Sequence, residues 1–449
     1  MKKAFKVIGW LCLICVVLIG GWFTVKILMP SLAATPATVP VWKVQVTPLE
    51  GNQQIAFTPN GKQVLDLNFN YRNKTNGLKR WDVATGKELL SVKSQENFSL
   101  LSNNGLYYTT IDKAEKGNSQ LRVYRISDQK QIAVVPNITN RGNIVQLLGK
   151  KPLIVTFDIQ NSDSKKKESI ERSYSFWDVS THSFIHPKPH QTKIFENYSI
   201  RPVDVAFSND GAKALSLWPV FTQTYKGKTS QFVEGLEPWP ESMNQKPKEA
   251  WLLNEIDGKI IKLPFSKSSS GFQFTWSKPT LSSDETLYAS VSSSDSGGFE
   301  WNGEDGTIWC YDLPHRSLRW KYYKSRQGPD KLLFSPDGTM LAVGGYSYGY
   351  SGTAGYVSIL DARTGKLIHG FTEQTLWGQI SDRTRYFITG ELYDIGFLKK
   401  RFGKGMEDYY RRKPPGNSGL PLSLAWSPDN KMLAAAYADG SLKLWRVKK

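Results

Sequence analysis

One short β-type run, ending on an aromatic or large aliphatic residue and a polar turn, occurs seven times in this chain of 449 residues. The copies are LKRWDV (78–83), LRVYRI (121–126), YSFWDV (174–179), AWLLNEI (250–256), TIWCYDL (307–313), VSILDA (357–362) and LKLWRV (442–447). A unit of this kind cannot bury its apolar face alone, so the copies are expected to stack against one another. The repetition therefore predicts one large repeat domain, although length alone suggests about three domains.

A second motif precedes most of these runs, in the form of an apolar stretch followed by Ser/Thr-x-Asn/Asp-Gly. The copies are IAFTPNG (55–61), SLLSNNG (99–105), VAFSNDG (205–211), LLFSPDG (332–338) and LAWSPDN (424–430), with degenerate copies at PTLSSDE (279–285) and LLGKKP (147–152). Such sequences form hairpin turns, because Gly supplies the positive φ and Asp or Asn closes the turn. Short turns such as DVATGK (82–87) and DARTGK (361–366) follow the aromatic runs and lead into a further apolar run. Each unit is therefore predicted to contain four antiparallel strands.

Together these motifs resemble the WD-repeat family, in its bacterial form with FSPDG-type turns. The resemblance covers residues 41–449 and is most specific in the first, sixth and seventh units, while the Gly-His dipeptide of eukaryotic members is absent. The resemblance implies an all-β fold, a closed β-propeller, with a role in protein interaction or scaffolding and usually without catalysis.

The two ends of the repeat region complement each other. The last unit supplies three strands and no fourth, whereas VWKVQV (41–46) alternates apolar and polar residues ahead of the first unit. Pairing these ends would remove open sheet edges that otherwise promote aggregation. We therefore expect seven blades, with the N-terminal strand completing the last. Eight blades remain the alternative, with WGQISDRTRYFITG (377–390) as half a blade.

The N-terminus has the pattern of a transmembrane anchor over residues 1–29. Lys2, Lys3 and Lys6 precede the uncharged run Val7–Val25, whose 19 residues would span about 29 Å as a helix. Positive charge on the N-terminal side predicts a cytoplasmic N-terminus and an extracytoplasmic propeller. Cleavage near Ala33, which would give a secreted or periplasmic protein, is the alternative. Residues 30–40 (PSLAATPATVP) are expected to form an extended linker.

The charge and the cysteines restrict the classes of partner and chemistry. The net charge is +18, of which four lysines lie in residues 1–34, so the remainder carries +14. Such a surface favours anionic partners, including acidic proteins and lipid headgroups. Nucleic acid is an unlikely partner of an extracytoplasmic domain. Only Cys310 lies outside the apolar N-terminus, which holds Cys12 and Cys15, so the folded part has no internal disulfide and Cys310 is expected to be a buried strand residue.

The long connections all fall on one predicted face, which is often the binding face in repeat proteins. Connections between second and third strands include 68–76, 158–173, 219–249, 292–305 and 344–355, and those between units include 187–202 and 372–420. Tyr and Trp are enriched where proteins bind each other. The expected partner-binding residues are therefore the loop aromatics and two arginines of the basic stretch 398–416, namely Trp239, Trp301, Tyr346, Tyr348, Tyr350, Arg411 and Arg412.

No sequence pattern supports a catalytic, cofactor or metal site. His182, His186 and His190 lack a completing Cys or carboxylate, and the acidic loop with Asp295, Glu300, Glu304 and Asp305 matches no calcium loop. The sequence thus predicts a membrane-anchored scaffold that binds a protein partner. The alternatives are a propeller enzyme, such as a hydrolase, lyase or quinoprotein, or a small-ligand sensor that uses the central channel; the apolar first strands of the units favour binding.

Overall fold

The computed structural model describes most of the repeat region and leaves out the N-terminal 39 residues. The described residues are 40–46, 53–70, 75–94, 97–112, 118–139, 143–148, 153–161, 170–185, 205–208, 212–225, 228–233, 249–254, 257, 259–264, 274–294, 306–323, 327–349, 352–372 and 420–448. The predicted anchor (1–29), nearly all of the linker and the segment 377–390 therefore lie outside the described residues.

All regular structure in the described residues is β, as the sequence predicts. The strands form seven antiparallel sheets in the order of the chain. The first sheet contains β2 (Gln53–Phe57), β3 (Gln63–Asn70), β4 (Thr75–Asp82) and β5 (Glu88–Ser94). The second contains β6 (Asn97–Leu101), β7 (Tyr107–Asp112), β8 (Asn118–Arg125) and β9 (Gln131–Thr139). The third contains β10 (Asn143–Leu148), β11 (Leu153–Asn161), β12 (Ile170–Asp178) and β13 (Ser183–Ile185).

The remaining four sheets follow the same plan, with one addition. The fourth contains β14 (Ala206–Phe207), β15 (Ala214–Tyr225), β17 (Glu249–Asn254) and β18 (Ile260–Pro264), with β16 (Lys228–Val233) paired to β15. The fifth contains β19 (Phe274–Leu281), β20 (Leu287–Ser294), β21 (Thr307–Asp312) and β22 (Ser317–Tyr322). The sixth contains β23 (Gln327–Phe334), β24 (Met340–Gly349), β25 (Gly352–Asp361) and β26 (Leu367–Thr372). The seventh contains β27 (Pro421–Trp426), β28 (Met432–Tyr437), β29 (Ser441–Arg446) and β1 (Trp42–Gln45).

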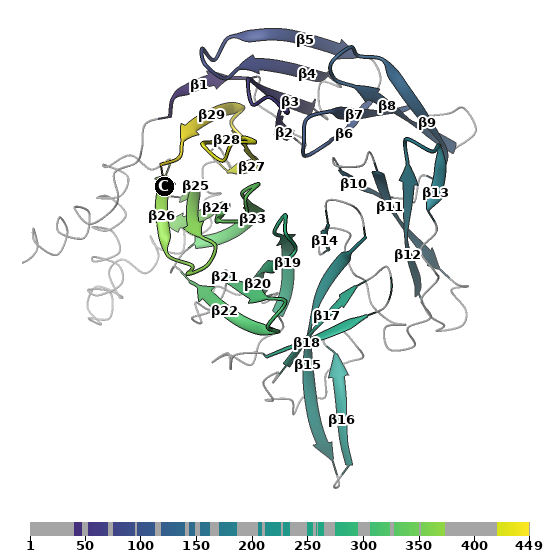
Figure 1. Cartoon of the computed structure of the whole chain (residues 1–449), viewed down its shortest axis with the longest axis vertical. Helices are drawn as coiled ribbons and strands as arrows, with labels where there is room; N and C mark the ends of the chain where they lie inside the picture. Colours follow the sequence, from purple (N-terminus) through teal and green to yellow (C-terminus); the bar gives the residue numbers. More distant parts are fainter. Residues whose placement is uncertain are drawn as a thin grey trace, which may run out of the picture.

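The sheets are arranged around a common centre (Figure 1). The first strand of each sheet, such as β2 or β27, lies towards the centre, and the last strand, such as β5 or β26, lies towards the outside. In the seventh sheet the outside position is taken by β1, from the start of the described chain. Trp42 of β1 lies opposite Leu444 of β29, and the pairing continues to Gln45 and Ser441.

The hydrophobic core is divided into seven clusters, one between each sheet and the next. Ile55, Val64 and Trp81 of the first sheet pack against Leu442 and Leu444 of the seventh. Each of the other six clusters lies between two consecutive sheets, from the first and second to the sixth and seventh. Alternate residues of a strand point to opposite faces, so each internal sheet contributes to two clusters. This is why strands such as β28, of sequence MLAAAY, are apolar on both faces.

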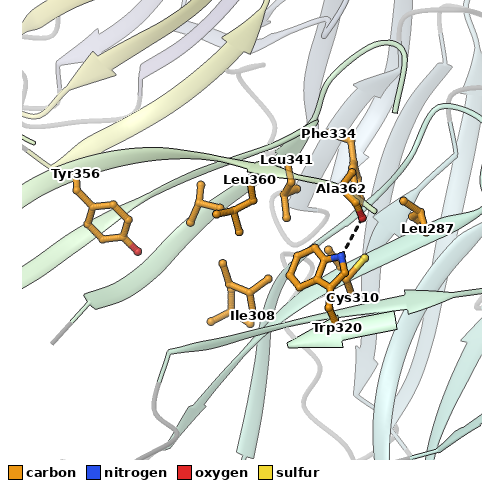
Figure 2. Close-up of a cluster of buried hydrophobic side chains, with 12 residues drawn as sticks. Leu287, Ile308, Cys310, Trp320, Phe334, Leu341, Tyr356, Leu360 and Ala362 are labelled. Carbon is orange, nitrogen blue, oxygen red and sulfur yellow. Dashed lines mark hydrogen bonds between the residues drawn. The ribbon is translucent and has the colours of Figure 1, made fainter. Parts of the chain in front are cut away.

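Side chains near the outer edge of one sheet also bond to a turn of the next sheet. Trp320 Nε1 donates to the carbonyl oxygen of Ala362 over 2.8 Å (Figure 2), and Trp42 Nε1 donates to that of Val83 over 2.8 Å. Ala362 and Val83 both directly follow the third strand of their sheet. Arg80 bonds to the carbonyl of Ile126, which occupies the same position in the second sheet. Successive sheets are thus joined by polar contacts as well as by apolar packing.

The turns between first and second strands follow the predicted chemistry. In the sixth sheet the Ser335 hydroxyl donates to Asp337 Oδ1 over 2.6 Å, Asp337 Oδ1 accepts from the Thr339 amide over 3.1 Å, and Gly338 has φ of 68°. Two turns that lack the glycine reach the same conformation, since Glu285 and Asn430 have φ of 60° and 62°.

The connections between second and third strands were predicted to be loops, but parts of them are paired strands. β15 continues past its partner β17 and pairs with β16 from Val220–Val233 to Tyr225–Lys228. β24 and β25 pair as far as Gly349 and Gly352, so much of 344–355 is strand and not loop. The extended parts of these strands contain Thr, Tyr, Phe and Val, which are residues enriched in strands.

Candidate interaction surfaces

The antiparallel order of strands creates two distinct ends of every sheet. Turns between first and second strands and between third and fourth strands share one end, which we call the turn face. Its described segments are 58–62, 82–87, 102–106, 125–130, 178–183, 282–286, 312–317, 335–339, 361–366 and 427–431. Connections between second and third strands and between successive sheets share the other end, which we call the hairpin face.

Several aspartates of the turn face bond within their own turns. Asp82 Oδ1 accepts hydrogen bonds from the Thr85 amide and hydroxyl, both over 2.8 Å, and these bonds lower the pKa of Asp82. Asp429 Oδ1 accepts from the Ser427 hydroxyl over 2.6 Å and from the Lys431 amide over 3.1 Å, and its pKa is lowered as well. These carboxylates therefore hold the backbone of the turns, and the turn face is short and internally bonded.

The hairpin face carries the extended strand pairs. The β15–β16 hairpin projects away from the ring of sheets (Figure 1). The β11–β12 pair extends to Asn161 and Ile170, and the β24–β25 pair extends to Gly349 and Gly352. Backbone pairing gives these projections a defined register, so they present side chains at fixed spacings. A partner that approaches the hairpin face would meet these extensions first.

Two of the predicted partner-binding residues lie on an extended hairpin. Tyr346 and Tyr348 belong to β24, at positions opposite Gly355 and Thr353 of β25. The other predicted residues lie outside the described residues, and so does the basic stretch 398–416; they are Trp239, Trp301, Tyr350, Arg411 and Arg412. The β15–β16 hairpin was missed as structure, although the alternation in VFTQTYKGKTSQFV (220–233) is a hairpin signal.

Cys310 is a core residue, as expected from the sequence. It is fully buried on β21, in the cluster between the fifth and sixth sheets (Figure 2). Burial raises the pKa of its thiol to about 12. Since a thiolate is the reactive form of cysteine, this side chain is suited to packing and not to nucleophilic chemistry.

The described part of the chain holds no group of three or more His, Cys, Asp and Glu side chains that would bind a metal. His182 is exposed in a turn with φ of 53°, while His186, His190 and the acidic loop around Asp295 lie outside the described residues. At the central strands, Asp330 and Lys331 form an ion pair of 3.1 Å.

One buried acid was not anticipated from the sequence. Asp66 on β3 is 0% exposed, and it accepts hydrogen bonds from Gln53 Nε2 over 2.7 Å and Asn68 Nδ2 over 3.4 Å. Burial raises its pKa to about 6, although these bonds and the charge of Lys79 act in the opposite direction. The signal in the sequence is the acid between Leu65 and Leu67, where β3 (QVLDLNFN) crosses the core.

One part of the chain is similar to a known protein family. Residues 411–446 match the family described as WD domain, G-beta repeat, and this segment includes the whole of β27, β28 and β29 of the seventh sheet. This match supports the WD-repeat resemblance for the last unit. No curated protein sequence matches the chain.

Two solved structures have a similar arrangement at low sequence identity. The β-propeller domain of Cps50 (Swd1) from Myceliophteria thermophila is 12% identical, with a TM-score of 0.49, over 92% of this chain and 100% of that one. A chain of the mitotic checkpoint complex is 11% identical, with a TM-score of 0.46, over 92% of this chain and 96% of that one. Within the described residues no helix is long and apolar enough to cross a membrane, and the predicted span lies before them.

Proposed function

We propose that this protein is a closed, seven-bladed WD-repeat-like propeller that serves as a protein-interaction scaffold through its hairpin face. The observation that carries the proposal is the asymmetry between the two faces. Turns on one face are short and bonded within themselves and to neighbouring turns, whereas strand pairs such as β15–β16 extend beyond the sheet on the other. A rigid ring that presents projecting hairpins is suited to holding a partner in a fixed orientation.

We also propose that residues 7–29 anchor the propeller in a membrane and that the propeller lies outside the cytoplasm. The support is the uncharged run Val7–Val25 and the lysines before it. Described residues begin at Pro40, directly before β1, and Val41 bonds to the carbonyl of Leu444 near the end of β29. An anchor attached there would lie on the turn face, so the hairpin face would point away from the membrane.

A capture experiment tests the interaction role. The full chain is compared with a variant in which 221–248 is replaced by Asn-Gly, which keeps the pairing of Val220 with Glu249. A control variant carries Lys130→Ala and Lys366→Ala on the turn face, where both side chains are exposed. Cross-linking in intact cells, followed by solubilisation, is expected to give a protein partner that the full chain and the control retain and the hairpin variant loses. Retention by all three would contradict the role of this face.

A further inference from the structure

The turn face carries a concentrated positive patch where the seventh sheet meets the first. The patch consists of five exposed side chains, which we call the basic seam: Lys62, Lys87, Lys431, Arg446 and Lys448. The only acids in the same turns are Asp82 and Asp429, whose Oδ1 atoms accept the turn hydrogen bonds described above. The seam therefore has an excess of three positive charges.

Hydrogen bonds place the members of the seam within each of the two sheets, and one close approach joins the sheets. The Val83 amide donates to the carbonyl of Lys62 over 2.9 Å, and the Val447 amide donates to that of Lys431 over 2.8 Å. A Cβ on Gly61 would lie 3.5 Å from Pro428 Cδ, so the two adjoining turns touch. Lys62 and Lys431 thus lie on adjoining turns, and Arg446 and Lys448 flank the residue whose amide bonds to Lys431.

Most of this charge is not neutralised within the described part of the chain. Lys431 Nζ lies 3.9 Å from Asp429 Oδ2, and these two side chains are 76% and 58% exposed. No acid of the described residues lies within ion-pair distance of Lys62, Lys87, Arg446 or Lys448. Elsewhere on the turn face the balance of acidic and basic side chains differs, since the turns of the fifth sheet carry the acids Asp284, Glu285 and Asp312.

The chain enters β1 at the seam. Trp42 donates its indole N–H to Val83, and a Cβ on Gly86 would lie 2.9 Å from Trp42 Cγ, so the start of β1 lies against the turn that holds Lys87. Ten residues, 30–39, separate the described chain from the end of the apolar segment. Even fully extended, such a tether reaches only about 35 Å, and shorter paths bring the seam to the bilayer surface.

We propose that the basic seam rests on anionic phospholipid headgroups of the membrane that holds residues 7–29. The inference depends on the anchor proposed above. Lysine and arginine side chains are attracted to anionic lipid within about one Debye length, roughly 8 Å at physiological salt. The tether brings this surface to the seam at high effective concentration, whereas an acidic protein would have to arrive by diffusion.

Amine labelling of the full-length protein tests the proposal. The protein is reconstituted in lipid nanodiscs of phosphatidylcholine alone or with phosphatidylglycerol, acylated with an amine-reactive reagent, and analysed by mass spectrometry. Acylation of Lys62, Lys87 and Lys431 is expected to be at least about threefold slower in the anionic discs, and the protection is expected to disappear at about 1 M salt. Lys262 and Lys321 are exposed on the outer strands β18 and β22 and serve as internal controls with unchanged rates.

Each other outcome has a distinct meaning. Equal acylation of the seam in both kinds of disc would overturn the lipid contact while leaving the anchor intact. Protection in neutral discs on addition of soluble polyphosphate, without protection by phosphatidylglycerol, would assign the seam to a polyanionic polymer and overturn the proposal. Failure of the full chain to remain with either disc would overturn the anchor itself.

Discussion

Asp66 is the residue at which the local chemistry departs most from an ordinary β-sheet core. It shares a face of β3 with Val64, which packs in the cluster between the seventh and first sheets. Burial favours the neutral carboxyl and raises its pKa to about 6 from the usual 3.8. The acid therefore weakens this junction once it ionises.

The stability contributed by neutral Asp66 is fully present below about pH 4 and is lost as the pH rises through about 6. Asp66→Asn is therefore expected to raise the free energy of unfolding at pH 8 by up to about 3 kcal/mol and to change it little at pH 4. Urea unfolding across this pH range measures the difference. Asp128→Asn is the control, because the Lys130 amide lowers the pKa of this exposed carboxyl and its effect on the pH profile has the opposite sign. A gain that does not vary with pH would contradict the assignment.

Gly86 and Gly61 give a matched pair of turn residues. Both have positive φ, of 70° and 68°, so alanine is strained at either position. A Cβ on Gly86 would also lie 2.9 Å from the Trp42 ring, whereas one on Gly61 would meet only Pro428 at an ordinary 3.5 Å. Gly86→Ala is expected to lower the free energy of unfolding by at least about 1 kcal/mol more than Gly61→Ala, as measured by denaturant titration. Equal losses would mean that Trp42 does not lie against this turn.

At the scale of strands and turns, the parts that pack in the core were predictable and the projecting parts were not. The Ser-Pro-Asp-Gly turn of the sixth sheet and the run TIWCYDL of β21 carry local signals that core packing reinforces. The β15–β16 hairpin lies within a long connection between a second and a third strand, so its alternating residues were assigned to a loop. Asp66 was not predicted because its burial depends on packing between sheets and on partners from other strands, such as Gln53 of β2.

The indole of Trp320 tests the polar contacts between successive sheets. Its N–H bonds to the Ala362 carbonyl, and the ring is 9% exposed. Trp320→Phe keeps much of the apolar volume but leaves this carbonyl unpaired, so the free energy of unfolding is expected to fall by about 1–3 kcal/mol. Tyr323→Phe, at a residue that is 44% exposed, is expected to change it by less than about 0.5 kcal/mol. Similar effects of both substitutions in thermal unfolding would argue against a structural role for the bond.

At the scale of the whole molecule, the proposed function depends on the pairing of the two ends. Leu442 and Leu444 of β29 are fully buried in the cluster between the seventh and first sheets, and Val44 of β1 packs against the same cluster. The same pairing determines where the tether enters the propeller. The proposed closure, the lipid contact of the basic seam and the orientation of the hairpins therefore all depend on it.

Removal of β1 is expected to expose the edge of β29 and the cluster beneath it. Deletion of 41–46, with the tether joined to residue 47, is predicted to lower the melting temperature by at least about 5 °C. Deletion of 31–36 in the linker is the control and is expected to leave the melting temperature unchanged. Melting curves that coincide for all three proteins would show that β1 contributes nothing to the fold.

Disulfide formation between the two ends tests the closure of the ring most directly. Val44 and Leu442 lie opposite each other in the register, and facing strand residues are close enough to form a disulfide. With Val44→Cys and Leu442→Cys, mild oxidation of the full chain is expected to join the two peptides in nearly all molecules, as seen by mass spectrometry. With Lys43→Cys and Leu442→Cys the side chains lie on opposite faces, and little cross-link is expected. Absence of the first disulfide, or equal yields of both, would contradict a shared sheet at the two ends of the chain.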